Sequence, residues 1–117
     1  MNRITLIGYL GKDAEQRTTR NNVTFTVLSL ATSKFWNDRN GDRQSRTEWH
    51  RCVVWLPKLA AFAAGLTKGQ FVHVEGELVS REYAKDGVTR RVVEVRTQSI
   101  LRLNKAGENH AGAAQSA

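Results

Sequence analysis

Hydrophobic and polar residues alternate along several stretches of this chain, with the period of two that is typical of β-strands. The stretch 47–55 shows the alternation most clearly. It has two faces, one with Trp49, Arg51, Val53 and Trp55, the other with His50, Cys52 and Val54. Further strands are predicted over residues 3–11, 23–33, 70–83 and 88–103, and the segment 23–33 is rich in β-branched residues.

Two segments depart from this alternation. Residues 34–46 are polar and predict a long loop or an extended hairpin tip, with Asn40-Gly41 as a turn signal. Pro57 can begin a helix, and an apolar stripe at helical spacing predicts a short helix over 58–67. Strand, strand, strand, helix, strand, strand is the element order of the OB-fold, a five-stranded partly open Greek-key barrel. We therefore expect an all-β OB-fold with one short helix between its third and fourth strands.

Length and composition indicate the number of domains and the cellular compartment. With 117 residues, one domain over 1–104 is expected, followed by a disordered tail over 105–117 rich in Ala, Gly, Ser and Gln. The single cysteine, Cys52, allows no internal disulfide and fits a reducing cytosol. No apolar run approaches the roughly 20 residues of a membrane span, and the N-terminus lacks signal-peptide architecture. A cytoplasmic protein is expected.

The formal charge of +7 is interleaved with apolar residues from Arg3 to Arg102, so the positive potential belongs to the folded body. Such a field favours polyanions, with nucleic acid ahead of acidic membranes. Besides Trp49 and Trp55, the polar hairpin segments carry Trp36 and Tyr83, and we expect these four aromatics near one groove. The basic side chains expected to accompany them are Arg39, Arg43, Arg46, Arg51 and Arg81, with Lys34 and Lys85.

Aromatic rings stack on bases of any identity, and basic side chains pair with phosphates. Because stacking needs open base faces, this combination selects single strands. A duplex reader would present a charged helix, whereas helix 58–67 carries only Lys58 and is predicted to plug the barrel. The alternative is structural: Trp49 and Trp55 are core residues, and Phe35 and Trp36 fold the loop back onto the barrel.

The remaining polar residues do not predict catalysis. His50, Cys52 and His73 lack zinc-site spacing, and Glu75 and Glu77 predict a solvated face or cross-strand pairs. The sequence has no phosphate loop, nucleophile elbow or metal-carboxylate cluster. We therefore expect no cofactor, no metal and no enzymatic activity.

The chain resembles the bacterial single-stranded DNA-binding proteins over about residues 2–103. The resemblance lies in Asn2-Arg3-Ile4, Ile7-Gly8-Tyr9-Leu10-Gly11-Lys12-Asp13-Ala14-Glu15, Leu30-Ala31-Thr32-Ser33, Thr47-Glu48-Trp49-His50-Arg51, and Lys68-Gly69-Gln70 through Val74-Glu75-Gly76-Glu77-Leu78. It implies a protein that coats single-stranded DNA in replication, repair and recombination, associated with the nucleoid and assembled as a homotetramer, with a dimer as the other possibility.

The resemblance also implies roles for individual residues. The residues that would stack on DNA are Trp36, Trp49, Trp55 and Tyr83. Trp55 stands where the family often has phenylalanine, and Tyr83 stands where it often has tryptophan. The residues that match basic positions along the DNA path of the family are Arg3, Arg51, Lys58, Lys68 and Arg81. His50 matches a histidine near the subunit interface.

The sequence departs from the family at its end, because it lacks the acidic peptide that recruits replication and repair enzymes. The expectation is either a truncated DNA-binding domain, which is favoured, or a paralogue without that docking role. Three rival functions stay open. They are an adaptor similar to primosomal replication protein N, a hydrolase or nuclease on the same scaffold, and a protein-binding module with aromatic hot spots.

Overall fold

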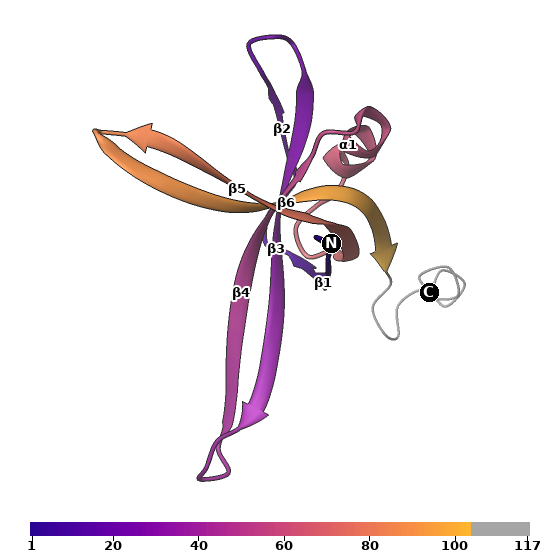
Figure 1. Cartoon of the computed structure of the whole chain (residues 1–117). Coiled ribbons are helices and arrows are strands. Elements are labelled where there is room, and N and C mark those ends of the chain that lie inside the picture. The colour runs from indigo at the N-terminus through magenta and orange to yellow at the C-terminus, as the bar shows by residue number, and fades with distance from the viewer. Residues whose placement is uncertain (104–117) are drawn as a thin grey trace.

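The computed structural model describes residues 1–103 as six strands and one helix, and two long hairpins project from a small barrel (Figure 1). The strands are β1 (Ile4–Leu10), β2 (Glu15–Thr18), β3 (Thr24–Asn37), β4 (Arg43–Val54), β5 (Phe71–Lys85) and β6 (Val88–Leu103). The helix is α1 (Pro57–Ala64), between β4 and β5. The predicted tail over 105–117 lies outside the described residues.

Five of these strands close into a barrel. The sheet order is β1-β5-β6-β4-β3-β2, and an additional pairing of β1 with β3 joins the two sides. All neighbours are antiparallel except β4 and β6, which run parallel where Cys52 faces Val95 and Val53 faces Arg96. The expected OB-fold is confirmed, with its helix in the expected connection.

The barrel interior is built from the alternate positions that the strand pattern marks as apolar. The buried side chains include Leu10, Leu28, Leu30, Cys52, Val54, Val72, Val74, Val95 and Ile100. Helix α1 adds Ala60 and Ala63, and the hydroxyl of Thr26 donates a hydrogen bond of 2.8 Å to the carbonyl of Ala60. The helix is therefore seated against the barrel, as expected of a plug, although it ends at Ala64 and is shorter than the predicted range 58–67.

The predicted loop over 34–46 is mostly strand. Strand β3 continues to Asn37 and β4 begins at Arg43, so the extended hairpin is the alternative that holds. The turn between them is organised by Asp38, whose Oδ1 accepts hydrogen bonds of 2.9 Å from the backbone N–H groups of Asn40 and Asp42. Polar residues sustain this ribbon because both of its faces meet water and cross-strand pairs stabilise it.

Strand β2 was not predicted, because its sequence Glu-Gln-Arg-Thr has no apolar alternation. It is a short exposed strand that pairs with the beginning of β3, from Glu15 opposite Val27 to Thr18 opposite Thr24. Val27, which lies opposite Glu15 in this pairing, is 4% exposed. This polar strand thus extends the sheet without contributing apolar residues to the core.

Close backbone approaches explain two of the glycines. A Cβ atom on Gly8 would collide with the backbone carbonyl of Ala31, where β1 closes against β3. A Cβ on Gly76 would collide with the carbonyl of Arg96, at the register shift between Glu75 and Gly76 in the β5–β6 ladder. Only glycine permits these approaches, so these two positions help to set the curvature of the barrel.

Candidate nucleic-acid interface

The β3–β4 hairpin has two faces that differ in chemistry. In its register Leu28 lies opposite Cys52 and Leu30 opposite His50, so these residues belong to the face that lines the barrel interior. Ser29 lies opposite Arg51 and Ala31 opposite Trp49, which places the arginine and the tryptophan on the outer face. The alternation predicted for 47–55 is therefore observed, with Trp49 and Arg51 facing away from the core.

Trp49 is a surface residue, with 61% of its area exposed. Its ring lies so close to Gly11 that a Cβ there would overlap the indole. The backbone of Gly11 therefore supports the ring from one side, while much of the rest of the ring meets solvent. The structural alternative, in which Trp49 is a core residue, is wrong. An exposed indole held from behind can stack on a planar ligand.

Trp55 lies just beyond the end of β4 and is 38% exposed. Its ring stacks on that of Phe25, with centroids 4.2 Å apart and an interplanar angle of 25°. An open hollow of about 420 Å³ adjoins Trp55 and is lined in part by Thr24 and Pro57. Phe25 was not among the expected site residues, although its position on the predicted strand 23–33 was a signal that could have suggested it.

Two arginines from different strands meet on one carboxylate. Arg51 Nε lies 2.6 Å from Glu94 Oε2, and Arg81 donates through Nε (3.1 Å) and an Nη atom (3.2 Å) to the same carboxylate. The side chain of Glu94 is 11% exposed, against 35% for Arg51 and 50% for Arg81. Tyr83 and Val92 complete, with the two arginines, an open hollow of about 320 Å³. Two guanidinium groups and a phenol thus share one depression of the outer surface.

The two arginines favour the charged form of Glu94. Burial on its own raises the pKa of Glu94, but the hydrogen bonds and positive charges of Arg81 and Arg51 outweigh it, so the pKa lies below the ordinary carboxylate range. In return, the hydrogen bond and negative charge of Glu94 raise the pKa of Arg81. The sequence offered no signal for Glu94, which lies 43 residues from Arg51 along the chain.

Trp36 is not on the same face of the hairpin as Trp49. Trp36 lies opposite Gln44, and the face they share is the continuation of the barrel interior beyond the core. Trp36 is 42% exposed there. The expectation of four aromatics near one groove is therefore wrong in this respect. Trp49, Trp55 and Tyr83 lie on the outer surface, and Trp36 faces the other way, because five positions separate it from Ala31, the partner of Trp49.

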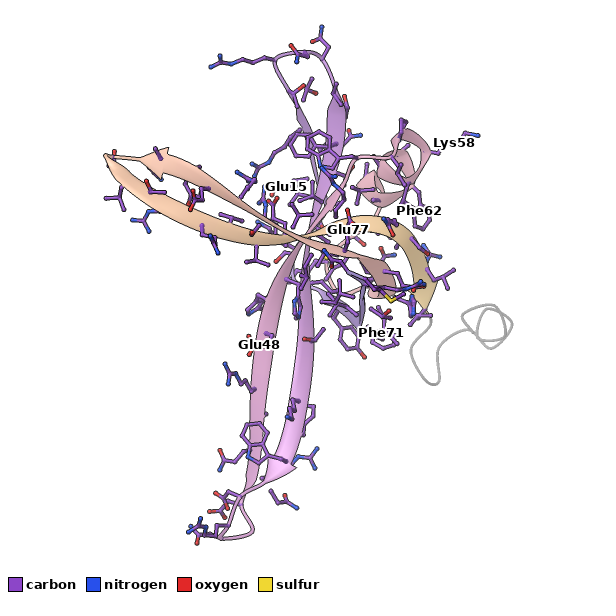
Figure 2. All side chains as sticks on the ribbon, viewed as in Figure 1. Glu15, Glu48, Lys58, Phe62, Phe71 and Glu77 are labelled. Atoms are coloured by element: carbon purple, nitrogen blue, oxygen red, sulfur yellow. The ribbon has the colours of Figure 1, made fainter. Side chains whose placement is uncertain are left out.

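The predicted basic residues are spread over the molecule rather than gathered in one site. Arg51 and Arg81 meet as described, and Arg39 and Arg46 belong to the β3–β4 hairpin, where Arg46 Nε lies 2.7 Å from Glu48 Oε2. Figure 2 shows Glu48 along this hairpin, far from Lys58, which projects from α1.

Two further predicted cations lie elsewhere on the barrel. Arg3 pairs with Glu75 at 2.6 Å, and the hydrogen bond from Arg3 lowers the pKa of Glu75. Lys68 follows the helix, and its backbone N–H donates to Asp13 Oδ1 at 2.8 Å. The structure therefore does not bring Arg3, Lys58 and Lys68 to the Arg51–Arg81 depression.

The residues considered as metal ligands or as a reactive thiol have the contacts and burial that are typical of structural residues. His50 Nε2 and the hydroxyl of Thr32 are 2.9 Å apart, and burial raises the pKa of the Cys52 thiol to about 12. Within residues 1–103, no three His, Cys, Asp or Glu side chains are grouped so as to hold a metal ion. No helix in the same range is long and apolar enough to cross a membrane.

A small OB-fold barrel with stacked, exposed aromatics and paired arginines on its outer surface belongs to the class of oligonucleotide- or oligosaccharide-binding domains. Comparison with known proteins narrows this class. Residues 1–103 match the Single-strand binding protein family, and the chain belongs to this family.

Individual relatives agree with this assignment. The single-stranded DNA-binding proteins of Neisseria meningitidis serogroup A and Xanthomonas axonopodis pv. citri are 42% and 39% identical over 97% and 92% of this chain. The chain spans 66% and 61% of the length of these two relatives.

Two solved structures have the same fold. The Plasmodium falciparum SSB in complex with ssDNA has a TM-score of 0.80 and 28% identity, covering 89% of this chain and 96% of that one. A deletion mutant of the single-stranded DNA binding protein from Thermus aquaticus has a TM-score of 0.78 and 30% identity, covering 92% of this chain and 52% of that one.

Proposed function

We propose that this protein binds single-stranded DNA without sequence preference and covers it during replication, repair and recombination. The observation that carries the proposal is the outer surface of the barrel, where the exposed indole of Trp49 adjoins Arg51, and Arg51 adjoins Arg81 and Tyr83. A ring next to guanidinium groups matches a base next to its phosphate.

The chemistry of this surface favours single strands over duplexes. Each stacked base contributes roughly 1–3 kcal/mol, and this contribution needs an open base face that a duplex does not offer. The described surface presents no charged helix of groove size, since α1 carries Lys58 alone. Stacking and phosphate pairing do not depend on base identity, so the proposal includes no readout of base edges. It also includes no catalytic step.

The individual roles follow from the placement of the side chains. Trp49, Trp55 and Tyr83 stack on bases along the outer surface, and Arg51 and Arg81 hold phosphates between them. Trp36, Arg39 and Arg46 make contacts along the hairpin, so the strand must pass around the hairpin to reach Trp36. Arg3, Lys58 and Lys68 contribute to the long-range positive potential and contact DNA only where the strand continues over the barrel.

The proposal also includes self-association, into a homotetramer or a dimer. The neighbouring strands β1, β5 and β6 expose apolar side chains in one layer: Ile7 lies opposite His73, and His73 opposite Leu101. Ile7 and Leu101 are 49% and 45% exposed, and His73 Nδ1 is buried without a hydrogen-bond partner among the described residues. A second copy would cover the apolar side chains and supply a partner for His73. His50 is proposed to lie near such an interface. Native mass spectrometry tests this part by counting subunits.

The decisive experiment is a titration of tryptophan fluorescence with oligo-deoxythymidylate at low and at high salt. Saturating quenching that persists in part at high salt supports stacking of the indoles on bases. Binding that leaves the fluorescence unchanged and disappears at high salt would show that only the net positive charge of the protein attracts the DNA. In that case the proposed function is wrong. A cytoplasmic, nucleoid-associated location accompanies the proposal, and recruitment of replication and repair enzymes is not part of it.

A further inference from the structure

Phe35 is an exposed aromatic residue for which neither the core nor the proposed roles account. It lies in β3 opposite Ser45, and 58% of its area is exposed. In the register of the hairpin it shares the outer face with Ala31 and Trp49, whereas its neighbour Trp36 lies on the other face. A phenylalanine exposed to this extent on a strand loses the stabilisation that burial of its ring would supply.

The ring of Phe35 is held by one cation. The guanidinium carbon of Arg43 lies 5.0 Å from the ring centroid, which is cation–π distance. Arg43 lies opposite Asn37, two residues along the strand from Ser45, so it reaches the ring diagonally across the hairpin. Among residues 1–103 Arg43 has no carboxylate partner within ion-pair distance. Its remaining N–H donors are available to an anion.

Phe35 and Trp49 lie too far apart along the hairpin to form a single stacking position. Ser45, opposite Phe35, and Trp49 are four residues apart on β4, which corresponds to about 14 Å at the usual rise of a strand. This separation is about four times the roughly 3.4 Å rise per nucleotide of one strand, so the two rings lie at different nucleotide positions. Phe35 and Trp49 would therefore engage different bases of one strand that runs along the outer face.

We propose that Phe35 and Arg43 form a further stacking and phosphate-binding position for single-stranded DNA near the tip of the β3–β4 hairpin. Together with Trp36 on the opposite face, this position makes the hairpin a two-sided contact. The inference rests on the proposed function. Charge favours a nucleic acid as the occupant, because segment 34–46 carries four basic side chains and two carboxylates, and one carboxylate, Asp38, is engaged in the turn.

The test compares Phe35→Ala with Phe62→Ala. Phe62 is 46% exposed on α1, and Figure 2 shows it on the helix, away from the tip of the β3–β4 hairpin, so its removal is a matched loss of an exposed phenyl ring. Binding is measured by the anisotropy of labelled oligo-deoxythymidylate of about 16 nucleotides, the upper end of the range for one OB-fold. Phe35→Ala is expected to weaken binding about tenfold, as loss of one stacked base does, and Phe62→Ala to leave it unchanged.

A ring exchange tests the position directly. The double variant Phe35→Trp, Trp36→Phe keeps both rings and moves the indole to the outer face. Its affinity is expected to match the original protein, and the moved indole is expected to be quenched on binding. Phe35→Leu, which keeps apolar area without a ring, is expected to lose affinity like Phe35→Ala.

The outcomes separate this inference from the proposed function. If the unaltered protein binds with quenched tryptophan fluorescence and Phe35→Ala binds equally well, the inference is overturned and the proposed function stands. If Phe35→Ala keeps its DNA affinity but changes the native mass, Phe35 belongs to a contact between copies and the inference is again wrong. If the unaltered protein shows no quenching, both fail together.

Discussion

Arg51 and Glu94 form a close ion pair on the outer surface of the barrel, with Nε and Oε2 2.6 Å apart. The pair joins β4 to β6, the two neighbouring strands of the sheet that run parallel. Because Arg81 binds the same carboxylate from β5, one partly buried acid orients two cations from two other strands. In the proposed function, Glu94 therefore competes with a phosphate for the two guanidinium groups, and it also holds both of them in place.

Replacing Glu94 by glutamine is expected to tighten binding to single-stranded DNA several-fold at moderate salt. Glutamine keeps the shape of the side chain and removes the charge that competes with phosphate. The slope of log affinity against log salt should steepen by about 0.7, the value for one additional phosphate contact on a single strand. Titrations at four or five salt concentrations measure this slope.

Glu82→Gln is the matched control for that experiment, since Glu82 lies 3.8 Å from Arg91 in an exposed pair outside the depression. It changes the net charge by the same amount and is expected to have a smaller effect. Weaker binding by Glu94→Gln would show that orientation of the arginines outweighs competition, contrary to the expectation.

The stability of the protein should depend on Glu94 at acid pH. The pKa of Glu94 is lowered in the folded protein, so its contribution to the free energy of unfolding is complete above the ordinary carboxylate pKa of about 4 and is lost as pH falls through the folded pKa. The original protein should therefore lose stability more steeply than Glu94→Gln below about pH 4. Urea unfolding of both proteins between pH 7 and pH 3 measures the difference, and parallel curves would contradict the assignment.

Trp49→Ala and Trp36→Ala are each expected to weaken binding about tenfold, the loss of one stacked base. Both rings are largely outside the core, so the unfolding temperature should change little. Because the two rings lie on opposite faces of the hairpin, their effects should add in the double variant. Anisotropy titrations with thermal unfolding check both statements. Unchanged affinity in both single variants would refute the stacking roles.

Gly8→Ala is expected to destabilise the barrel by about 3 kcal/mol, because the new methyl group would collide with the backbone carbonyl of Ala31. Relief of this collision would require opening the β1–β3 pairing. Gly65→Ala is the control, since a Cβ there lies 3.6 Å from the carbonyl oxygen of Phe62, in ordinary contact, and φ is −88°. Its stability should change by no more than about 0.5 kcal/mol. Urea unfolding of both variants compares the two sites, and equal stability would show that β1 can move away from β3.

The local pattern of apolar and polar residues predicted correctly which face of its own strand or helix a side chain occupies. The alternation over 47–55 predicted that Trp49 and Arg51 share a face and that Cys52 and Val54 point the other way. Pro57 predicted the beginning of α1. These inferences hold because strand and helix periods follow from backbone geometry.

The same patterning failed where a relationship depends on pairing between segments. Trp36 and Trp49 are both aromatic residues of one hairpin, and only the register shows that they face opposite ways. Strand β2 has no apolar alternation, and its pairing with β3 decides its conformation.

By itself, the sequence determined the order of the helix and the five barrel strands, the apolar positions of the barrel, the positive charge and the aromatic residues available for stacking. Only the tertiary structure decided which of these residues act together. It set Trp36 apart from Trp49, joined Arg51 and Arg81 through Glu94, and placed Phe35 on the face of Trp49. The physical reason is that strand register and barrel closure bring together residues distant in the chain, and no local period encodes those distances.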